Sequence, residues 1–213
     1  TGRAGKEPTS WRVLLAGLRY VYEKKIIFGA ITLDLFVVLL GGVTALLPVF
    51  AKDILDVGPT GAGFLRGAIA AGSLATGIAL TRVSMTRAVG STLYISILVF
   101  GAATILFGLS TVLWLSIAAM VILGIGDMVS VYIRVTLIQI ATPDEMRGRV
   151  SAVNSVFTGA SNEIGEFRAG MMAAAIGTVP AVLFGGIGCF AVAAICWFTF
   201  PELRRVQRMD REL

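Results

Sequence analysis

Six long apolar runs dominate this sequence and leave little room for a water-soluble fold. They cover residues 26–51, 61–81, 91–109, 112–140, 151–176 and 180–200. A helix that rises about 1.5 Å per residue needs about 20 residues to cross the hydrocarbon core of a bilayer. Only 15% of the 213 residues are charged, whereas a typical soluble domain has about 25%. The sequence therefore predicts an all-α membrane protein, a bundle of six transmembrane helices with the lipid bilayer as its solvent.

Polar segments flank the apolar runs and complete the predicted organisation. Residues 1–25 form an arm in which apolar side chains recur at helical spacing from Trp11 to Tyr22, with arginines on the other face. We expect this arm to carry an amphipathic helix in the membrane interface, and the alternative is an extension of the first transmembrane helix. Residues 26–200 form the transmembrane domain, and residues 201–213 form a polar tail.

The basic residues outside the apolar runs predict the orientation of the chain. If the N-terminus is cytoplasmic, nearly all of these residues fall on the cytoplasmic side, and only Lys52 falls on the other. The positive-inside rule therefore predicts that both termini are cytoplasmic. The net charge of +5 then reflects membrane topology, and we expect no nucleic-acid partner.

Seven ionisable residues lie within the apolar runs, where each would cost about 2.5–3.5 kcal/mol if it faced lipid at a helix centre. They are Asp34, Arg66, Asp127, Arg134, Glu163, Glu166 and Arg168. Such residues must face the protein interior or water. They occur in the first, second, fourth and fifth runs, and the third and sixth runs have none. This three-helix period predicts a 3+3 inverted repeat whose uncharged third members face lipid.

Three of these residues are candidates for substrate or proton binding. Asp127 lies near the middle of the fourth run, where its side chain cannot reach the membrane surface. Arg134 follows two helical turns later on the same face, too far away for a direct pair with Asp127. Asp34 is interpreted either as a proton site or as the partner of an arginine.

The carboxylates of the fifth run are candidates for proton coupling. Glu163 and Glu166 are neighbours on one helical face, and two adjacent carboxylates inside a membrane do not both ionise easily. The alternative is a static buried pair with Arg134 or Arg168. We expect Arg66 and Arg168 to be structural charge partners, and Arg66 can also extend to the near membrane surface.

Several chemical classes are excluded or disfavoured. The sequence has no histidine, which excludes His-ligated metal sites and Ser-His or Cys-His dyads. Cys189 and Cys196 share one helical face of the last run and are expected to pack as small apolar side chains. No nucleotide-binding glycine motif is present. We therefore expect no enzymatic activity, no cofactor and no metal.

Three segments resemble major facilitator superfamily transporters. Residues 142–150 resemble the P-E-x-x-R-G-R loop between helices ten and eleven, residues 33–51 resemble helix seven, and residues 200–205 resemble the end of helix twelve. The residues that match the loop motif are Pro143, Glu145, Arg147, Gly148 and Arg149. Together the segments are most similar to the enterobactin-exporter-like group, also called transmembrane secretion effectors. One departure is Thr81, which replaces the acidic residue of the family's motif after the second helix.

The resemblance implies one half of a twelve-helix transporter with alternating access, comprising helices seven to twelve. The implied partners are a small-molecule substrate, protons and an N-terminal six-helix half that is missing here. In agreement, the chain begins at Thr1 without a methionine or signal peptide, which we interpret as a fragment or a processed form. In the family, Asp34, Asp127 and Arg134 would face the substrate path, and Glu163 and Glu166 would lie against the other half.

The resulting hypothesis is a secondary transporter in a bacterial inner membrane. It would export a small organic solute, such as a drug or a siderophore, in exchange for protons. The alternatives are the membrane domain of an ATP-driven transporter and, further from the sequence pattern, a lipid-modifying membrane enzyme.

Overall fold

The computed structural model describes residues 11–82 and 88–206, and all regular structure in this part of the chain is helical. The elements are α1 (Trp11–Glu23), α2 (Lys25–Gly41), the 3₁₀ helix η1 (Val43–Leu46), α3 (Leu47–Asp53), α4 (Gly58–Arg82), α5 (Val89–Leu109), α6 (Leu113–Ile140), α7 (Asp144–Ile176), α8 (Thr178–Thr199) and α9 (Pro201–Arg204). The expected all-α membrane architecture is thus confirmed.

Within residues 11–82 and 88–206, five helical segments are long and apolar enough to cross a membrane, whereas the sequence pattern predicted six. They are α2 with α3, α4, α5, α6 and α8. The predicted run at 151–176 lies within α7, a helix of 33 residues. Because α7 mixes Ser, Asn, Thr and Gly with its charged residues, its composition does not meet the same apolar standard.

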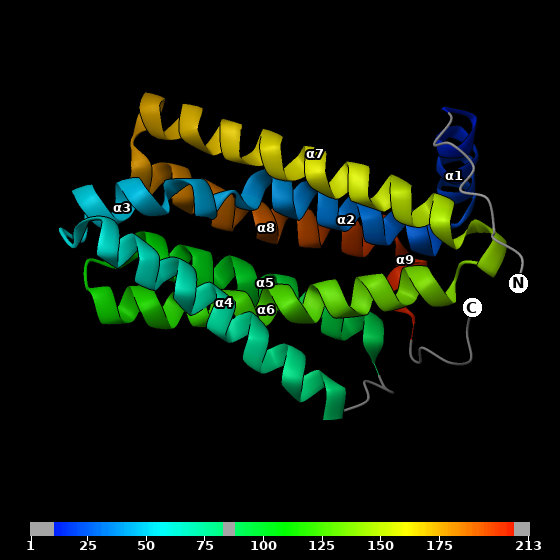
Figure 1. Ribbon diagram of the computed structural model, residues 1–213, viewed down its shortest axis with the longest axis horizontal. Coiled ribbons are helices and arrows are strands. Elements are labelled where there is room, and N and C mark those ends of the chain that lie inside the picture. Colours follow the sequence, from blue (N-terminus) through cyan, green and yellow to red (C-terminus); the bar gives the residue numbers. More distant parts are fainter. Residues whose placement is uncertain (1–10, 83–87, 207–213) are drawn as a thin grey trace, which may run out of the picture.

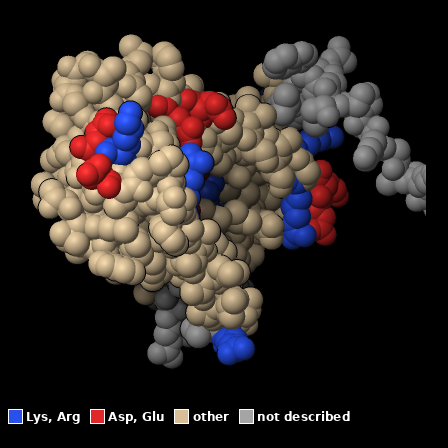
Figure 2. Space-filling model, turned by 60° about the vertical axis from the view of Figure 1, so that its left-hand side comes forward, with Lys and Arg blue, Asp and Glu red and all other residues tan. Residues whose placement is uncertain are grey.

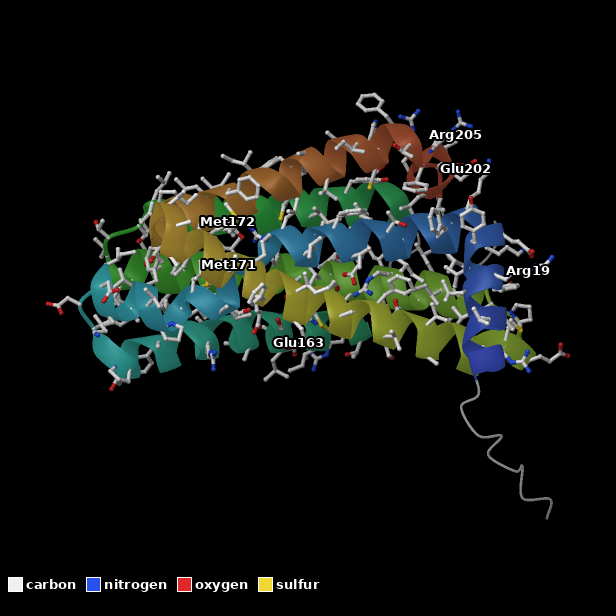
Figure 3. All side chains as sticks on the ribbon, turned by 90° about the horizontal axis from the view of Figure 1, so that it is seen from above. Arg19, Glu163, Met171, Met172, Glu202 and Arg205 are labelled. Carbon is white, nitrogen blue, oxygen red and sulfur yellow. The ribbon has the colours of Figure 1, made fainter. Side chains whose placement is uncertain are left out.

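The long helices run roughly side by side along the long axis of the molecule (Figure 1). Helix α2 packs against α7 and α8, α6 packs against α4 and α5, and α5 packs along α8. The short helix α1 lies across one end of this bundle, near α9, in both Figure 1 and Figure 3. One core between the helices is centred on the fully buried rings of Phe50 and Phe107, whose centroids are 4.2 Å apart.

The surface agrees with a chain that faces lipid over most of its length. Figure 2 shows an almost uncharged surface on which acidic and basic side chains gather in a few groups. Large apolar side chains such as Trp114, Phe167 and Phe198 are more than two-thirds exposed. Exposure of this kind is unfavourable in water, so the bilayer is the medium in which this bundle is stable.

Glycine permits the closest helix contact, which joins α4 to α6. A Cβ atom added to Gly72 would overlap the carbonyl oxygen of Val121, and one added to Gly124 would overlap the carbonyl oxygen of Ile69. Close backbone approach at small residues is a main source of helix association in membranes, where no hydrophobic effect acts between helices.

We expect Gly124→Ala to destabilise the bundle by about 1–3 kcal/mol, because the new methyl group must push two backbones apart. The measurement is the midpoint of thermal unfolding of the full-length protein in detergent. Gly63→Ala in α4 is the matched control, since a Cβ there meets no atom within 4 Å. It should leave the midpoint unchanged or raise it slightly. Equal losses at both positions would contradict the packing argument.

Candidate functional site

The helix formed by the first apolar run is broken near its centre. Helix α2 ends at Gly41, the 3₁₀ helix η1 follows, and α3 begins at Leu47. The irregular segment lies just before Pro48, and Pro48 occupies the first turn of α3. The physical reason is that proline disrupts the preceding turn and is itself tolerated at a helix start.

The break lies against α7. A Cβ added to Gly42 would be 2.7 Å from the carbonyl oxygen of Gly165, and one added to Gly165 would be 2.7 Å from the carbonyl oxygen of Val38. The two backbones therefore touch, and the charged residues of α7 that flank Gly165 lie beside the interrupted helix.

Arg168 of α7 binds the carbonyl groups that the break leaves free. Its Nε donates to the carbonyl oxygen of Leu39 at 2.9 Å, and its Nη2 donates to that of Leu40 at 2.6 Å. In a continuous helix these oxygens would accept from the amides of Val43 and Thr44, and neither bond occurs in the structure.

Other groups complete the surroundings of this guanidinium. Its Nη1 lies 2.9 Å from the sulfur of Met172, and its carbon lies 5.5 Å from the centre of the Phe184 ring. Within the described ranges, no carboxylate forms a salt bridge with Arg168. The structure therefore differs from the expected charge pair, because the guanidinium stands in for two missing peptide amides.

A pocket of about 140 Å³ with a partly polar lining opens at the same break. Its polar lining comes from three segments: Thr44 of η1, Asp127 of α6, and Asn162 and Glu166 of α7. The hydroxyl of Thr44 donates to Oε1 of Glu166 at 3.3 Å. Asp127 and Glu166, two candidates from the sequence, thus line one cavity, while the Thr and Asn residues were not predicted.

A second polar cluster lies between α2, α6 and α7. Nη1 of Arg134 is 2.8 Å from Oδ2 of Asp34, and both side chains are nearly buried, with 6% and 11% of their area exposed. The same nitrogen is 3.4 Å from Oδ1 of Asn154, and the hydroxyl of Thr158 is 3.5 Å from Oδ2 of Asp34. Of the two interpretations open for Asp34, the structure shows the arginine partner.

The remaining intramembrane charges stand apart from both clusters. Glu163 is exposed on the side of α7 (Figure 3) and lines neither the pocket nor the ion pair. Arg66 is exposed on α4, and the described part of the chain offers it no salt-bridge partner. The structure therefore does not join Glu163 to Arg134 or Arg168.

The residues of the predicted loop motif lie in the first turns of α7, which begins earlier than expected. Pro143 is the N-cap residue, while Glu145 and Gly148 make no close packing contact. Arg147 donates from Nε to the carbonyl oxygens of Gln139 and Thr142, at 3.2 and 3.3 Å. A cation at these carbonyls stabilises the C-terminal end of α6.

Helix α1 is joined to the same connection. The hydroxyl of Tyr20 donates to the carbonyl oxygen of Ala141 at 3.0 Å, and desolvation raises the pKa of Tyr20 above its ordinary value, so it remains a donor. Gly17 packs against the backbone of Arg149, where an added Cβ would be 2.9 Å from the carbonyl oxygen. The motif therefore fixes α1, α6 and α7 to one another.

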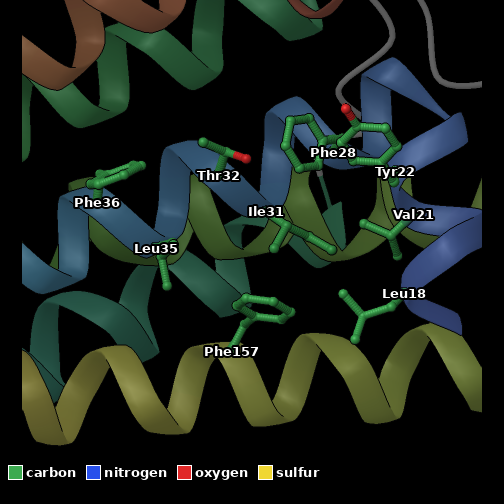
Figure 4. Close-up of a pocket in the computed structure, with 9 residues that line it drawn as sticks. All are labelled: Leu18, Val21, Tyr22, Phe28, Ile31, Thr32, Leu35, Phe36 and Phe157. Carbon is green, nitrogen blue, oxygen red and sulfur yellow. The ribbon is translucent and has the colours of Figure 1, made fainter. Parts of the chain in front are cut away.

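An apolar pocket lies between α1, α2 and α7. Figure 4 shows it between α1, the first turns of α2 and Phe157 of α7, and its volume is about 230 Å³. Leu18, Ile31 and Leu35 are among its lining residues. Its lining is apolar apart from the Thr32 and Tyr22 hydroxyls, so it is distinct in character from the pocket at the helix break.

Comparison with known proteins identifies the family. Residues 7–212 match the family described as transmembrane secretion effector. The chain is 25% identical over 200 residues to the enterobactin exporter EntS of Escherichia coli strain SMS-3-5 / SECEC, covering 94% of this chain and 48% of that protein. It is 27% identical over 195 residues to the protein of the same name from Escherichia coli O1:K1 / APEC, covering 92% and 47%.

The chain thus spans about half the length of these curated relatives. The relatives carry the name of an exporter, which agrees with the apolar helices and not with an enzyme. Since the family match extends over almost the whole sequence, the chain belongs to the transmembrane secretion effector family of major facilitator transporters, and it is a multi-pass membrane protein.

Proposed function

We propose that this chain is one half of a secondary transporter that exports a small organic solute by alternating access. The observation that carries the proposal is the presence of two clusters of polar side chains inside an otherwise apolar bundle, which together would form a polar path. They are the buried pair of Asp34 and Arg134 and the pocket lined in part by Asp127 and Glu166. Ionisable residues at membrane depth mark substrate or ion pathways, and the family of exporters agrees with this interpretation.

In this proposal α7 also spans the membrane, as the fifth of six transmembrane helices along the chain, and the six helices form a 3+3 inverted repeat. Figure 1 supports it, since α7 runs along the length of the bundle beside α2. If the first three spans are exchanged with the last three, α2 takes the place of α6 and α7 takes the place of α4. The contact of α2 with α7 then corresponds to the contact of α6 with α4. Glycines from both partners permit close approach in each contact, Gly42 and Gly165 in the first and Gly72 and Gly124 in the second.

The proposed orientation puts α1, α9 and the connection between α6 and α7 at the cytoplasmic face of a bacterial inner membrane. These three elements lie at the same end of the bundle (Figure 1), where Figure 3 also labels Arg19 and Arg205. This agrees with the positive-inside rule. Helix α1, which crosses the end of the bundle, would then lie in the interface with residues 1–25 as a cytoplasmic arm.

The missing N-terminal half would close the polar path from its other side, and protons would drive export. Asp127 and Glu166 are the proposed substrate or proton sites, because their pocket is open. Asp34 is held by Arg134, so protonation of Asp34 would release the arginine. Glu163, on the exposed side of α7, is proposed to act at the contact with the other half.

We expect Asp127→Asn and Glu166→Gln each to flatten the pH dependence of export by the full-length protein in proteoliposomes. An amide keeps the shape of the side chain but cannot carry the proton. The control is Asp53→Asn, which changes an exposed carboxylate at the end of α3 and should leave the pH profile unchanged. If both amide variants keep the wild-type pH profile of export, the proposal that Asp127 and Glu166 carry the proton is wrong.

A further inference from the structure

A large apolar groove follows the outer side of α5 and α8, away from the polar path. Its volume is about 600 Å³, within the range of ligand sites, about 300–1,000 Å³. Residues of α5 and α8 line it: Ser91, Tyr94, Ile95 and Leu98, with Phe190, Ala193, Ala194, Trp197 and Phe198. These residues recur at helical spacing over about two turns of each helix. The groove therefore runs along the helices for about 10 Å, from the end of the bundle near α9 toward its middle.

The cytoplasmic end of this groove, in the orientation proposed above, is basic. The guanidinium carbon of Arg204 lies 5.2 Å from the centre of the Trp197 ring, which forms part of the groove wall. Arg205 follows on the exposed surface at the same end (Figure 3). An apolar channel that ends at cations has the charge pattern of a phospholipid with a negative headgroup.

A buried polar atom in the groove wall is also without a partner. The hydroxyl of Tyr94 accepts and donates no hydrogen bond within residues 11–82 and 88–206, although the side chain is only 3% exposed. Its ring packs edge-on against Trp197, with the centroids 5.0 Å apart. A buried donor of this kind calls for an acceptor, and a phosphate or ester oxygen entering beside Trp197 supplies one.

We propose that this groove binds an anionic phospholipid of the cytoplasmic leaflet, with one acyl chain between α5 and α8 and the phosphate at Arg204 and Arg205. Neither helix contributes an acidic or basic side chain to the groove, so the acyl chain meets only apolar side chains and the side chains of Ser91 and Tyr94. Trp197 marks the headgroup depth, which is the usual position of tryptophan in membrane proteins. The site is separate from the proposed transport path and does not depend on transport activity.

The test uses quenching of Trp197 fluorescence by lipids brominated on the acyl chain. In the full-length protein every other tryptophan is replaced by phenylalanine, and the protein is reconstituted in bilayers with brominated phosphatidylglycerol or brominated phosphatidylcholine. We expect the anionic lipid to be preferred at Trp197 roughly fivefold for each arginine near the membrane surface. Arg204→Gln with Arg205→Gln should reduce this preference to about one.

A matched protein retains Trp114 as its single tryptophan. Trp114 is 77% exposed in the first turn of α6, and no guanidinium in the described part of the chain lies against its ring. It should be quenched equally by both lipids. Equal quenching of Trp197 by the two lipids, or a preference that persists in the double arginine variant, overturns the proposal and leaves only a non-specific lipid shell.

Discussion

Asp34→Asn is expected to lower the free energy of unfolding by about 3–5 kcal/mol, the usual effect of removing one partner from a buried ion pair. The substitution leaves Arg134 charged and 95% buried, and it replaces the anionic partner by a neutral amide oxygen, beside that of Asn154 at 3.4 Å. Uncompensated charge in a low-dielectric interior is far more costly than the loss of one hydrogen bond. The measurement is the thermal unfolding midpoint of the full-length protein in detergent.

A double variant separates the charge effect from a packing defect. Asp34→Asn combined with Arg134→Gln removes both charges and should recover most of the stability lost in the single variants, because no unpaired charge remains. Destabilisation that is simply additive would contradict the ion pair as the cause. The free energy of unfolding of Arg134→Lys should lie between those of Asp34→Asn and the wild type. Lysine keeps the charge but loses the planar group that also reaches Asn154.

Most helix boundaries could be predicted, because apolar length and proline positions are local signals. The predicted runs at 91–109 and 112–140 correspond closely to α5 and α6, which span Val89–Leu109 and Leu113–Ile140. The start of α7 at Asp144 was missed, since the polar sequence of its first turns resembles a loop. The charges at those positions in fact favour a helix start, as Asp144 and Glu145 occupy the first turn.

The candidate site was predicted in its residue types but not in its pairings. Asp34 and Arg134 are far apart in sequence, and only the packing of α2 against α6 decides that they meet. The position of Arg168 depends on the break after Gly41, and a Gly-Gly pair in an apolar run does not by itself distinguish a broken helix from a close helix contact. Thr44 and Asn162 carry an even weaker signal, because isolated small polar residues are common in transmembrane helices.

Arg168 is the other position at which we expect a large effect. Arg168→Met keeps a long flexible side chain but removes the donors to the carbonyl groups of Leu39 and Leu40. A buried acceptor without a partner costs about 1–3 kcal/mol, so the loss should amount to roughly 2–6 kcal/mol for the two carbonyl groups together. The thermal midpoint should fall accordingly, and Arg168→Lys should retain part of the stability because its ammonium keeps N–H donors but lacks the separated donor nitrogens of the planar guanidinium.

Arg66→Met is the matched control for this substitution. Arg66 is exposed on α4, so its loss should change stability by less than about 0.5 kcal/mol. A similar midpoint for both methionine variants would show that the guanidinium of Arg168 does not support the fold, and the carbonyl groups would then be satisfied by water from the polar pocket.

Hydrogen exchange at the break gives a second, local measurement of the same interaction. Without Arg168, the carbonyl groups of Leu39 and Leu40 regain the amides of Val43 and Thr44 only if η1 rewinds into continuous α-helix. We therefore expect the exchange of these amides to change in Arg168→Met and to stay unchanged in Arg66→Met. Slower exchange would indicate that α2 and α3 have joined, and faster exchange would indicate that the segment has opened. Either result ties the interrupted helix to one side chain of α7, since a break maintained by Gly42 and Pro48 alone would leave these amides unaffected.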